Sequence, residues 1–195
     1  VGEGGMVITN SKDLYEKIAE FSDHGHMHIP DVPRGKDPRR IPGLNYRMSE
    51  LTAAVGIAQL RKIDYILQTA QKNKDILKSQ LIKIPGINMR IFSDEGGAQG
   101  DTLIFSMIDS NAALSLETAL TSEGFGTKIL PEAIEWHYAG AWDHILSSFD
   151  SKEEIIKKYS QTGDLLTRSI CLNIPVIFEE SQINKLASII GSHIG

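Results

Sequence analysis

The stretch GLNYRMSELTAAVGIAQL, residues 43–60, decides the fold. Ser49 is a favourable N-cap residue, and the residues after it predict one helix from Ser49 to about Ile84, ending at Pro85-Gly86. At about 1.5 Å per residue this helix would span roughly 50 Å, a length typical of a connector between two domains. The prediction rests on an apolar stripe at helical spacing, formed by Leu51, Val55, Ala58, Ile63, Ile66, Ala70, Leu77 and Leu81.

Upstream of this helix, the chain opens with a glycine-rich turn, Gly2-Glu3-Gly4-Gly5. Paired glycines permit left-handed backbone and the close approach of another group, or form a simple tight turn. Residues 6–9 then predict a short buried strand, and residues 12–21 predict a helix capped by Asn10-Ser11. An opening of this kind, without an initiator methionine, is typical of the middle of a domain, so we expect a fragment or domain of a longer protein.

Residues 22–43 form a long loop that contains four prolines, three glycines and three histidines. A loop of this length in a compact protein is usually functional or disordered. Three hypotheses stay open for its alternating His24, His26 and His28: a metal site, hydrogen bonding to a polar substrate, or plain solvation.

The motif around Asn45 and Arg47 lies where this loop enters the long helix. An amide and a guanidinium beside a helix N-terminus form a suitable anion site, because backbone N–H groups and a forked donor converge there. Arg47 could instead pair with a nearby acid such as Glu50, and the sequence does not separate the two interpretations.

Downstream, the chain alternates strand and helix. The order predicts a small domain in which helices pack on a mostly antiparallel sheet. We expect strands at 87–92, 102–108, 125–130 and 170–175, and helices from Asn111 to Glu123, from a capping box at Ser151 to about Arg168, and at 181–194. An aromatic loop at 136–142 could line a sugar site, form a subunit contact or build a satellite core.

The composition of the 195 residues excludes several classes of function. A net charge of −5 disfavours a general nucleic-acid or anionic-membrane surface. No apolar run approaches the roughly 18 residues of a membrane span. The single cysteine, Cys171, forms no internal disulfide, which suits a reducing compartment, and we expect a cytoplasmic protein.

Three motifs, GEGGMVITN, FSDHG and GLNYRMSELTAAVGIAQL, resemble the DegT/DnrJ/EryC1/StrS sugar aminotransferases in order and separation. The resemblance covers the entire chain and becomes weaker after about Ile84. It implies an α/β fold: the carboxy-terminal part of a fold-type-I enzyme, with a long connecting helix and a small sheet covered by helices. The implied domains are the end of the large cofactor-binding domain (1–44), an interdomain helix (45–85) and a small domain (86–195).

The same resemblance implies a homodimer with shared active sites that uses pyridoxal 5'-phosphate to move an amino group from glutamate to a keto or aldehyde sugar. The lysine that forms a Schiff base with the cofactor lies before the GEGG motif in that family, so we expect the present chain alone to be inactive. Asn45, and with it Arg47, would reach the cofactor phosphate of the neighbouring active site. No metal is implied, and the substrate rim would comprise His24, His26, Arg34, Trp136 and His137.

A narrower resemblance concerns the substrate. Three segments are similar to the branch that aminates position 8 of an oxidised octulosonate, a free sugar acid of lipopolysaccharide. They are FSDHGHMH, PRGKDPRRIPGLNYR and the tryptophan-rich stretch that runs through WDHI, residues 142–145. Arginine and histidine in the loop would suit its carboxylate. The alternatives are a nucleotide-linked 4-keto hexose as substrate, or a catalytically dead interaction domain that uses the exposed apolar face of the long helix as its contact.

Overall fold

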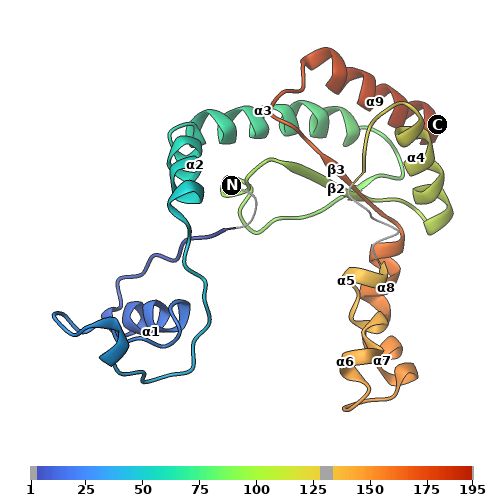
Figure 1. Cartoon of the computed structure of the whole chain (residues 1–195). Coiled ribbons are helices and arrows are strands. Elements are labelled where there is room, and N and C mark those ends of the chain that lie inside the picture. The colour runs from blue at the N-terminus through green and yellow to red at the C-terminus, as the bar shows by residue number, and fades with distance from the viewer. Residues whose placement is uncertain (1–3, 128–133, 195) are drawn as a thin grey trace. The chain divides into compact units, whose positions relative to one another are not determined.

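The computed structural model in Figure 1 describes residues 4–127 and 134–194 of the chain. The chain divides into two compact units, Val1–Ile63 and Asp64–Gly195, and each is described by itself. The predicted domains 1–44, 45–85 and 86–195 concern a complete enzyme and stay a prediction. None of the helices described is long and apolar enough to cross a membrane.

Two capped helices organise the first unit. Helix α1 (Lys12–Ser22) begins where predicted, and the Ser11 hydroxyl accepts the Leu14 N–H at 3.3 Å. Helix α2 (Glu50–Leu60) begins after Ser49, whose hydroxyl accepts the Thr52 N–H at 3.1 Å. Between them runs the long loop, interrupted only by the short 3-10 helix η1 (Arg34–Lys36). Both predicted N-caps are therefore confirmed.

The strand predicted at residues 6–9 is wrong. These residues have no strand structure in this chain, and Ile8 is 87% exposed. A strand needs a neighbour to accept and donate its backbone hydrogen bonds, and no described segment of the unit pairs with this one. An apolar sequence alone therefore did not produce the element.

The single long helix predicted from Ser49 to Ile84 is also wrong, because the chain turns at Arg61 and Lys62. Helix α2 ends at Leu60, and helix α3 (Ile63–Leu81) begins after the turn. The Lys62 N–H donates to the Gln59 carbonyl at 2.9 Å, a three-residue spacing that tightens the backbone. The apolar stripe continued through this turn because both helices carry apolar residues, so its periodicity could not reveal the break.

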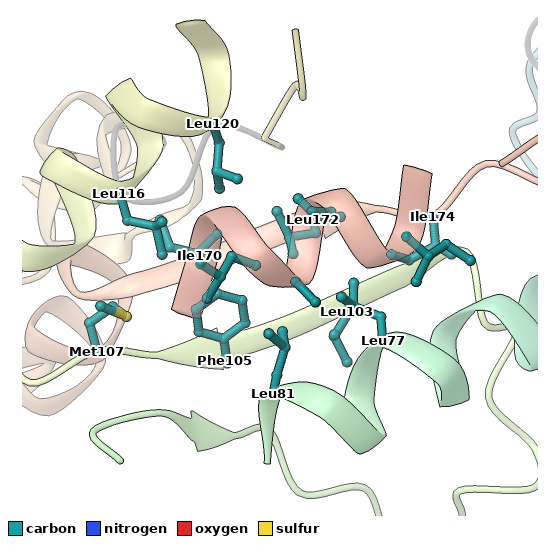
Figure 2. Close-up of a cluster of buried hydrophobic side chains, with 14 of the residues drawn as sticks. Leu77, Leu81, Leu103, Phe105, Met107, Leu116, Leu120, Ile170, Leu172 and Ile174 are labelled. Atoms are coloured by element: carbon teal, nitrogen blue, oxygen red, sulfur yellow. The ribbon is translucent and has the colours of Figure 1, made fainter. Parts of the chain in front are cut away.

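The second unit is built on a three-stranded antiparallel sheet in the order β1 (Asn88–Met89), β2 (Thr102–Ser106), β3 (Ser169–Asn173). Leu103 lies opposite Leu172, and Phe105 opposite Ile170, which places four apolar side chains on one face. Helices α3, α4 (Ser110–Ser122) and α9 (Glu180–Ile194) contribute most of the other large side chains of this core. Met107 and Ile174, which follow β2 and β3, complete it (Figure 2). The predicted helices on an antiparallel sheet are confirmed.

Some element boundaries differ from the prediction. The N-cap of α4 is Asp109, whose carboxylate accepts the Ala112 N–H at 2.9 Å, and not Asn111. The capping box at Ser151 and Glu154 is confirmed, but the helix it opens is divided into α7 (Lys152–Lys158) and α8 (Ser160–Thr167). The strand expected at 125–130 reduces to a single bridge from Thr127, and residues 128–130 lie outside the described part of the chain.

The aromatic segment contains a satellite core around Tyr138. It runs through α5 (Ile134–His137), η2 (Ala139–Ala141) and α6 (Asp143–Leu146). The Tyr138 ring is buried, and its hydroxyl donates to the Ile156 carbonyl at 3.3 Å. A Cβ on Gly163 would lie 3.0 Å from this ring, so the glycine leaves room for it. For Tyr138, the satellite-core interpretation is therefore correct.

Candidate functional site

The interior of the first unit is polar. Its buried residues within the described range are Gly25 and four ionisable side chains, Glu20, Asp23, His26 and Asp37. Buried charges are costly unless they are paired. Here each carboxylate meets a partner from the long loop or from the segment after it, and we call this set the loop network: Glu20, Asp23, His26, Asp37, Arg34, Arg39, Arg40 and Arg47.

Backbone pairing brings the end of α1 against the Asn45 segment. The Leu44 N–H donates to the Phe21 carbonyl at 2.8 Å, and the His24 N–H returns a bond to the Leu44 carbonyl at 3.0 Å. Asp23 and Asn45 thereby form an antiparallel bridge. Residues far apart in the sequence are thus neighbours, and the pairing fixes the positions of their Cα atoms, from which the side chains extend.

Asp23 is the most heavily engaged acid of the loop network. Arg34 donates to both carboxylate oxygens, with Nη1 2.8 Å from Oδ2. Arg47 Nε lies 3.2 Å from Oδ1, and His28 Nε2 lies 3.6 Å from Oδ2. The Arg34 hydrogen bond is the main cause that lowers the pKa of Asp23 to about 2, against the opposing effect of burial.

Asn45 and Arg47 lie beside this carboxylate. Asn45 Oδ1 accepts both the backbone N–H and the Nε–H of Arg47, each at 3.3 Å. In the described part of the chain, the amide nitrogen of Asn45 and the terminal nitrogens of Arg47 have no hydrogen-bond partner. The alternative interpretation, that Arg47 pairs with an acid, is confirmed, but the acid it meets is Asp23 and not Glu50.

Two further pairs complete the loop network. Arg40 donates to both oxygens of buried Glu20, with Nη2 2.6 Å from Oε1. His26 lies between Asp37 and Arg39: Nδ1 is 3.3 Å from Asp37 Oδ2 without hydrogen-bond geometry, and Nε2 is 3.4 Å from Arg39 Nη2. Because Arg39 can only donate, Nε2 accepts, which assigns the proton of a neutral ring to Nδ1.

Asp37 also holds the backbone of the loop. Its carboxylate accepts the His28 N–H at 2.9 Å and the Ile29 N–H at 3.2 Å. Burial alone would raise the pKa of Asp37, but these two backbone hydrogen bonds and His26 outweigh it, and the net direction is downward. The carboxylate therefore stays ionised and fixes the turn that carries His28.

The structure brings only some of the predicted site residues together. Arg34, Asn45 and Arg47 meet around Asp23, whereas His26 lies in the separate Asp37 pair. His24 is exposed and its backbone is left-handed (φ 58°). Among the described residues no three His, Cys, Asp or Glu side chains could hold a metal, so the three-histidine metal hypothesis gains no support.

The other two predicted rim residues, Trp136 and His137, end helix α5 in the second unit. Their side chains lie outside the described part of the structure, as do Gly2 and Glu3 of the glycine-rich turn. Their role at a substrate site stays a prediction.

Sequence reasoning missed the acids. No motif in the sequence assigns a role to Asp23, Glu20 or Asp37. One signal could have found them: the long loop and its flanks carry several arginines in a chain of net negative charge, and arginines close to each other need carboxylates between them.

The depressed pKa of Asp23 predicts an acid transition in the first unit. A carboxyl whose folded pKa is below its ordinary value of 3.8 stabilises the fold fully above that value, and the contribution is lost as the pH falls through about 2. The ¹³C shift of the Asp23 carboxyl should therefore titrate with a midpoint near 2, and Arg34→Ala should raise that midpoint. The neighbouring exposed cation gives a matched control, Lys36→Ala, and an unchanged midpoint in Arg34→Ala would contradict the assignment.

Comparisons with known proteins place the chain in a family. The sequence profile of the DegT/DnrJ/EryC1/StrS aminotransferase family matches residues 1–190. GDP-perosamine synthase of Vibrio cholerae is 33% identical over 97 residues, which are 49% of this chain and 24% of that protein. The UDP-4-amino-4,6-dideoxy-N-acetyl-beta-L-altrosamine transaminase of Helicobacter pylori is 36% identical over 70 residues, 36% of this chain and 18% of that protein.

Solved structures show the same fold at low identity. The Helicobacter pylori aminotransferase PseC has a TM-score of 0.72 at 15% identity, over 95% of this chain and 47% of its own. The pyridoxal-phosphate form of the sugar aminotransferase Spr1654 from Streptococcus pneumoniae has a TM-score of 0.72 at 12% identity, over 95% and 44%. The chain thus spans about half of these structures, and the predicted fold class, a mixed α/β portion of a fold-type-I aminotransferase, is confirmed.

Proposed function

Because this chain belongs to the DegT/DnrJ/EryC1/StrS aminotransferase family, we propose that it is part of a pyridoxal-phosphate-dependent sugar aminotransferase. One observation supports a specific contribution of this chain to cofactor binding. Among the described residues, the Asn45 amide nitrogen and the Arg47 terminal nitrogens have no hydrogen-bond partner, and both side chains lie at the exposed rim of the loop network. We assign these donors to the cofactor phosphate and call Asn45 and Arg47 the phosphate clamp.

The residues of the clamp fit a phosphate group. An uncharged amide and a guanidinium offer donors only, because Asn45 Oδ1 is already occupied by Arg47. The N-terminus of α2 follows at Glu50, and the positive end of its helix dipole adds to the attraction for an anion. When bound, pyridoxal phosphate supplies the electron sink for amino transfer, while these residues would only hold and orient it.

For the substrate, we propose a nucleotide-linked keto sugar. The names of the relatives supply the support, since they refer to GDP-, UDP- and dTDP-linked sugars. The free octulosonate acid has less support than its motifs suggested. Its carboxylate was expected to meet loop cations, but Arg34 and Arg40 are already paired with Asp23 and Glu20.

The remaining parts of the proposal follow the family. They are a homodimer in which Asn45 reaches the phosphate of the neighbouring active site, glutamate as amino donor, and a cytoplasmic location. The proposed substrate-rim residues remain His24, His26, Arg34, Trp136 and His137. Of these, Arg34 forms an ion pair with Asp23, which a bound substrate would share or displace.

Asn45→Ala in the longer protein that completes the fold should weaken binding of pyridoxal phosphate by about tenfold, because a hydrogen bond to a charged group contributes roughly 1.5–3 kcal/mol. Equilibrium dialysis of the cofactor gives the affinity directly. A second exposed asparagine, changed in Asn111→Ala, is the matched control. Unchanged cofactor affinity in Asn45→Ala would contradict the clamp.

The 195-residue chain alone should not transaminate. Supplied with pyridoxal phosphate and glutamate, it should leave the cofactor spectrum unchanged beyond the uncatalysed rate, because no lysine of the chain is proposed for the covalent role. Absorbance spectroscopy follows the cofactor. Turnover by the purified chain would contradict this part of the proposal.

A further inference from the structure

We propose that Asp23 is a positioning residue for the phosphate clamp: it holds Arg47 so that the clamp presents only hydrogen-bond donors to an anion. This inference rests on the proposed function. It assigns a role to a buried acid that touches neither cofactor nor substrate and acts through Arg47 and Asn45.

The position of the carboxylate is fixed by the backbone beneath it. The bridge between Asp23 and Asn45 is flanked by the His24–Leu44 bond of 3.0 Å and by the bond from the Tyr46 N–H to the Ser22 carbonyl, 2.9 Å. The Asp23 N–H itself donates to the Glu20 carbonyl at 3.2 Å. Asp23 therefore cannot move away from Asn45 without breaking this pairing.

The carboxylate lies between two guanidinium groups. Arg34 occupies both oxygens with its terminal nitrogens, while Arg47 approaches Oδ1 through Nε. With the acid removed, the two like charges would face each other with no compensation, and repulsion would drive the half-exposed Arg47 into solvent. Asp23 is the only acid within ion-pair distance of Arg47 among the described residues.

The position of Arg47 Nε decides which end of the Asn45 amide, the oxygen or the nitrogen, faces outward. Arg47 Nε–H donates to Asn45 Oδ1 at 3.3 Å, and Nε lies 3.2 Å from Asp23 Oδ1 as an ion pair without hydrogen-bond geometry, so this nitrogen lies against both the amide and the acid. The amide oxygen is thereby turned toward Arg47, and its nitrogen is left for an outside acceptor. Without this side-chain anchor only the Arg47 backbone N–H, 3.3 Å away, would hold the amide oxygen, so the amide would rotate more readily and present its oxygen, which repels a phosphate.

The test uses Asp23→Asn, which keeps the shape of the side chain and removes its charge. In the full chain, we expect the Arg47 Nε–H, observed by ¹⁵N NMR, to exchange with water at least about tenfold faster than in the wild type, since a charge-assisted contact is lost. The matched control is Asp31→Asn, a change at an exposed acid of the same loop. Wild-type exchange of Arg47 Nε–H in Asp23→Asn would overturn the inference.

A second measurement separates positioning from a general effect on the fold. Inorganic phosphate is titrated into the wild type, Asp23→Asn, Asn45→Ala and the double variant, and the backbone amides of Arg47 and Ser49 report binding. We expect about tenfold weaker binding in Asp23→Asn, and in the double variant a loss smaller than the sum of the two single losses, because Asp23 acts in part through Asn45. Full additivity of the two losses would overturn the inference.

The proposed function has its own outcome in the same experiment. If phosphate leaves the wild-type amides of Arg47 and Ser49 unchanged, the clamp assignment fails, and the positioning role fails with it. If Asn45→Ala weakens phosphate binding but Asp23→Asn does not, the clamp stands and only the positioning role is wrong.

Discussion

Phe105→Ala is expected to destabilise the second unit by about 3–5 kcal/mol, enough to remove much of the stability of a typical domain. Phe105 is completely buried in β2, opposite Ile170 of β3. Figure 2 shows its ring among side chains from the sheet and from the helices that cover it. Truncation removes the apolar contacts of the ring and leaves a cavity that elements fixed by sheet hydrogen bonds cannot fill.

Urea denaturation followed by circular dichroism measures this loss. The chain offers a matched control in Phe149→Ala, the same substitution at a phenylalanine that is 79% exposed in the same unit. That change should alter the free energy of unfolding by less than about 0.5 kcal/mol. Equal losses at the two positions would mean that the sheet face carrying Phe105 is not the core of this unit.

Predictions from sequence succeeded where a short segment carries its own stabilising contacts. Ser11, Ser49 and Ser151 each cap a helix through a bond to an N–H three residues later, so a local pattern is enough to find them. The apolar stretch at 6–9 and the turn at Arg61 depend instead on distant partners or on small changes in backbone hydrogen bonding. Neither leaves a periodic signal in the sequence.

The same distinction applies to the candidate site. Asn45 and Arg47 stay predicted phosphate ligands: they share a motif at a helix start, and the resemblance to the family implied the role. Asp23 was not assigned a role, because its contact with Arg34 and Arg47 depends on a backbone pairing between two segments separated by the long loop. Charge balance indicates that such an acid is needed, but only the fold shows which one it is.

Gly43→Ala is expected to open the loop network, the largest effect that we predict in the first unit. A Cβ on Gly43 would lie 2.8 Å from the His24 carbonyl carbon and 2.9 Å from the Glu20 carbonyl oxygen, and closer still to the Gly25 nitrogen. All three are backbone atoms, so no flexible side chain can move aside. We expect a loss of about 3 kcal/mol or more in the free energy that keeps this segment closed.

Hydrogen exchange of the His24, Leu44 and Tyr46 amides measures that loss, since each donates in the pairing that the new methyl group would disrupt. Their exchange should accelerate by at least about a hundredfold, the factor that corresponds to roughly 2.7 kcal/mol. Gly35→Ala is the matched control, because a Cβ at Gly35 would meet nothing within 4 Å in the same loop. Unchanged exchange in Gly43→Ala would show that the two segments stay paired and accommodate the methyl group, which would contradict this prediction.

Gly43 also affects the candidate site, because it lets two backbone segments approach each other closely. The close approach of the backbone at residues 20–25 to the segment after Gly43 sets the reach from the Asp23 carboxylate to Arg47. Gly43→Ala should therefore weaken phosphate binding at least as much as Asp23→Asn, although it changes no charge and no donor. If amide protection is lost while phosphate affinity stays at the wild-type value, Asn45 and Arg47 do not need the network to bind the anion, and the glycine serves the fold alone.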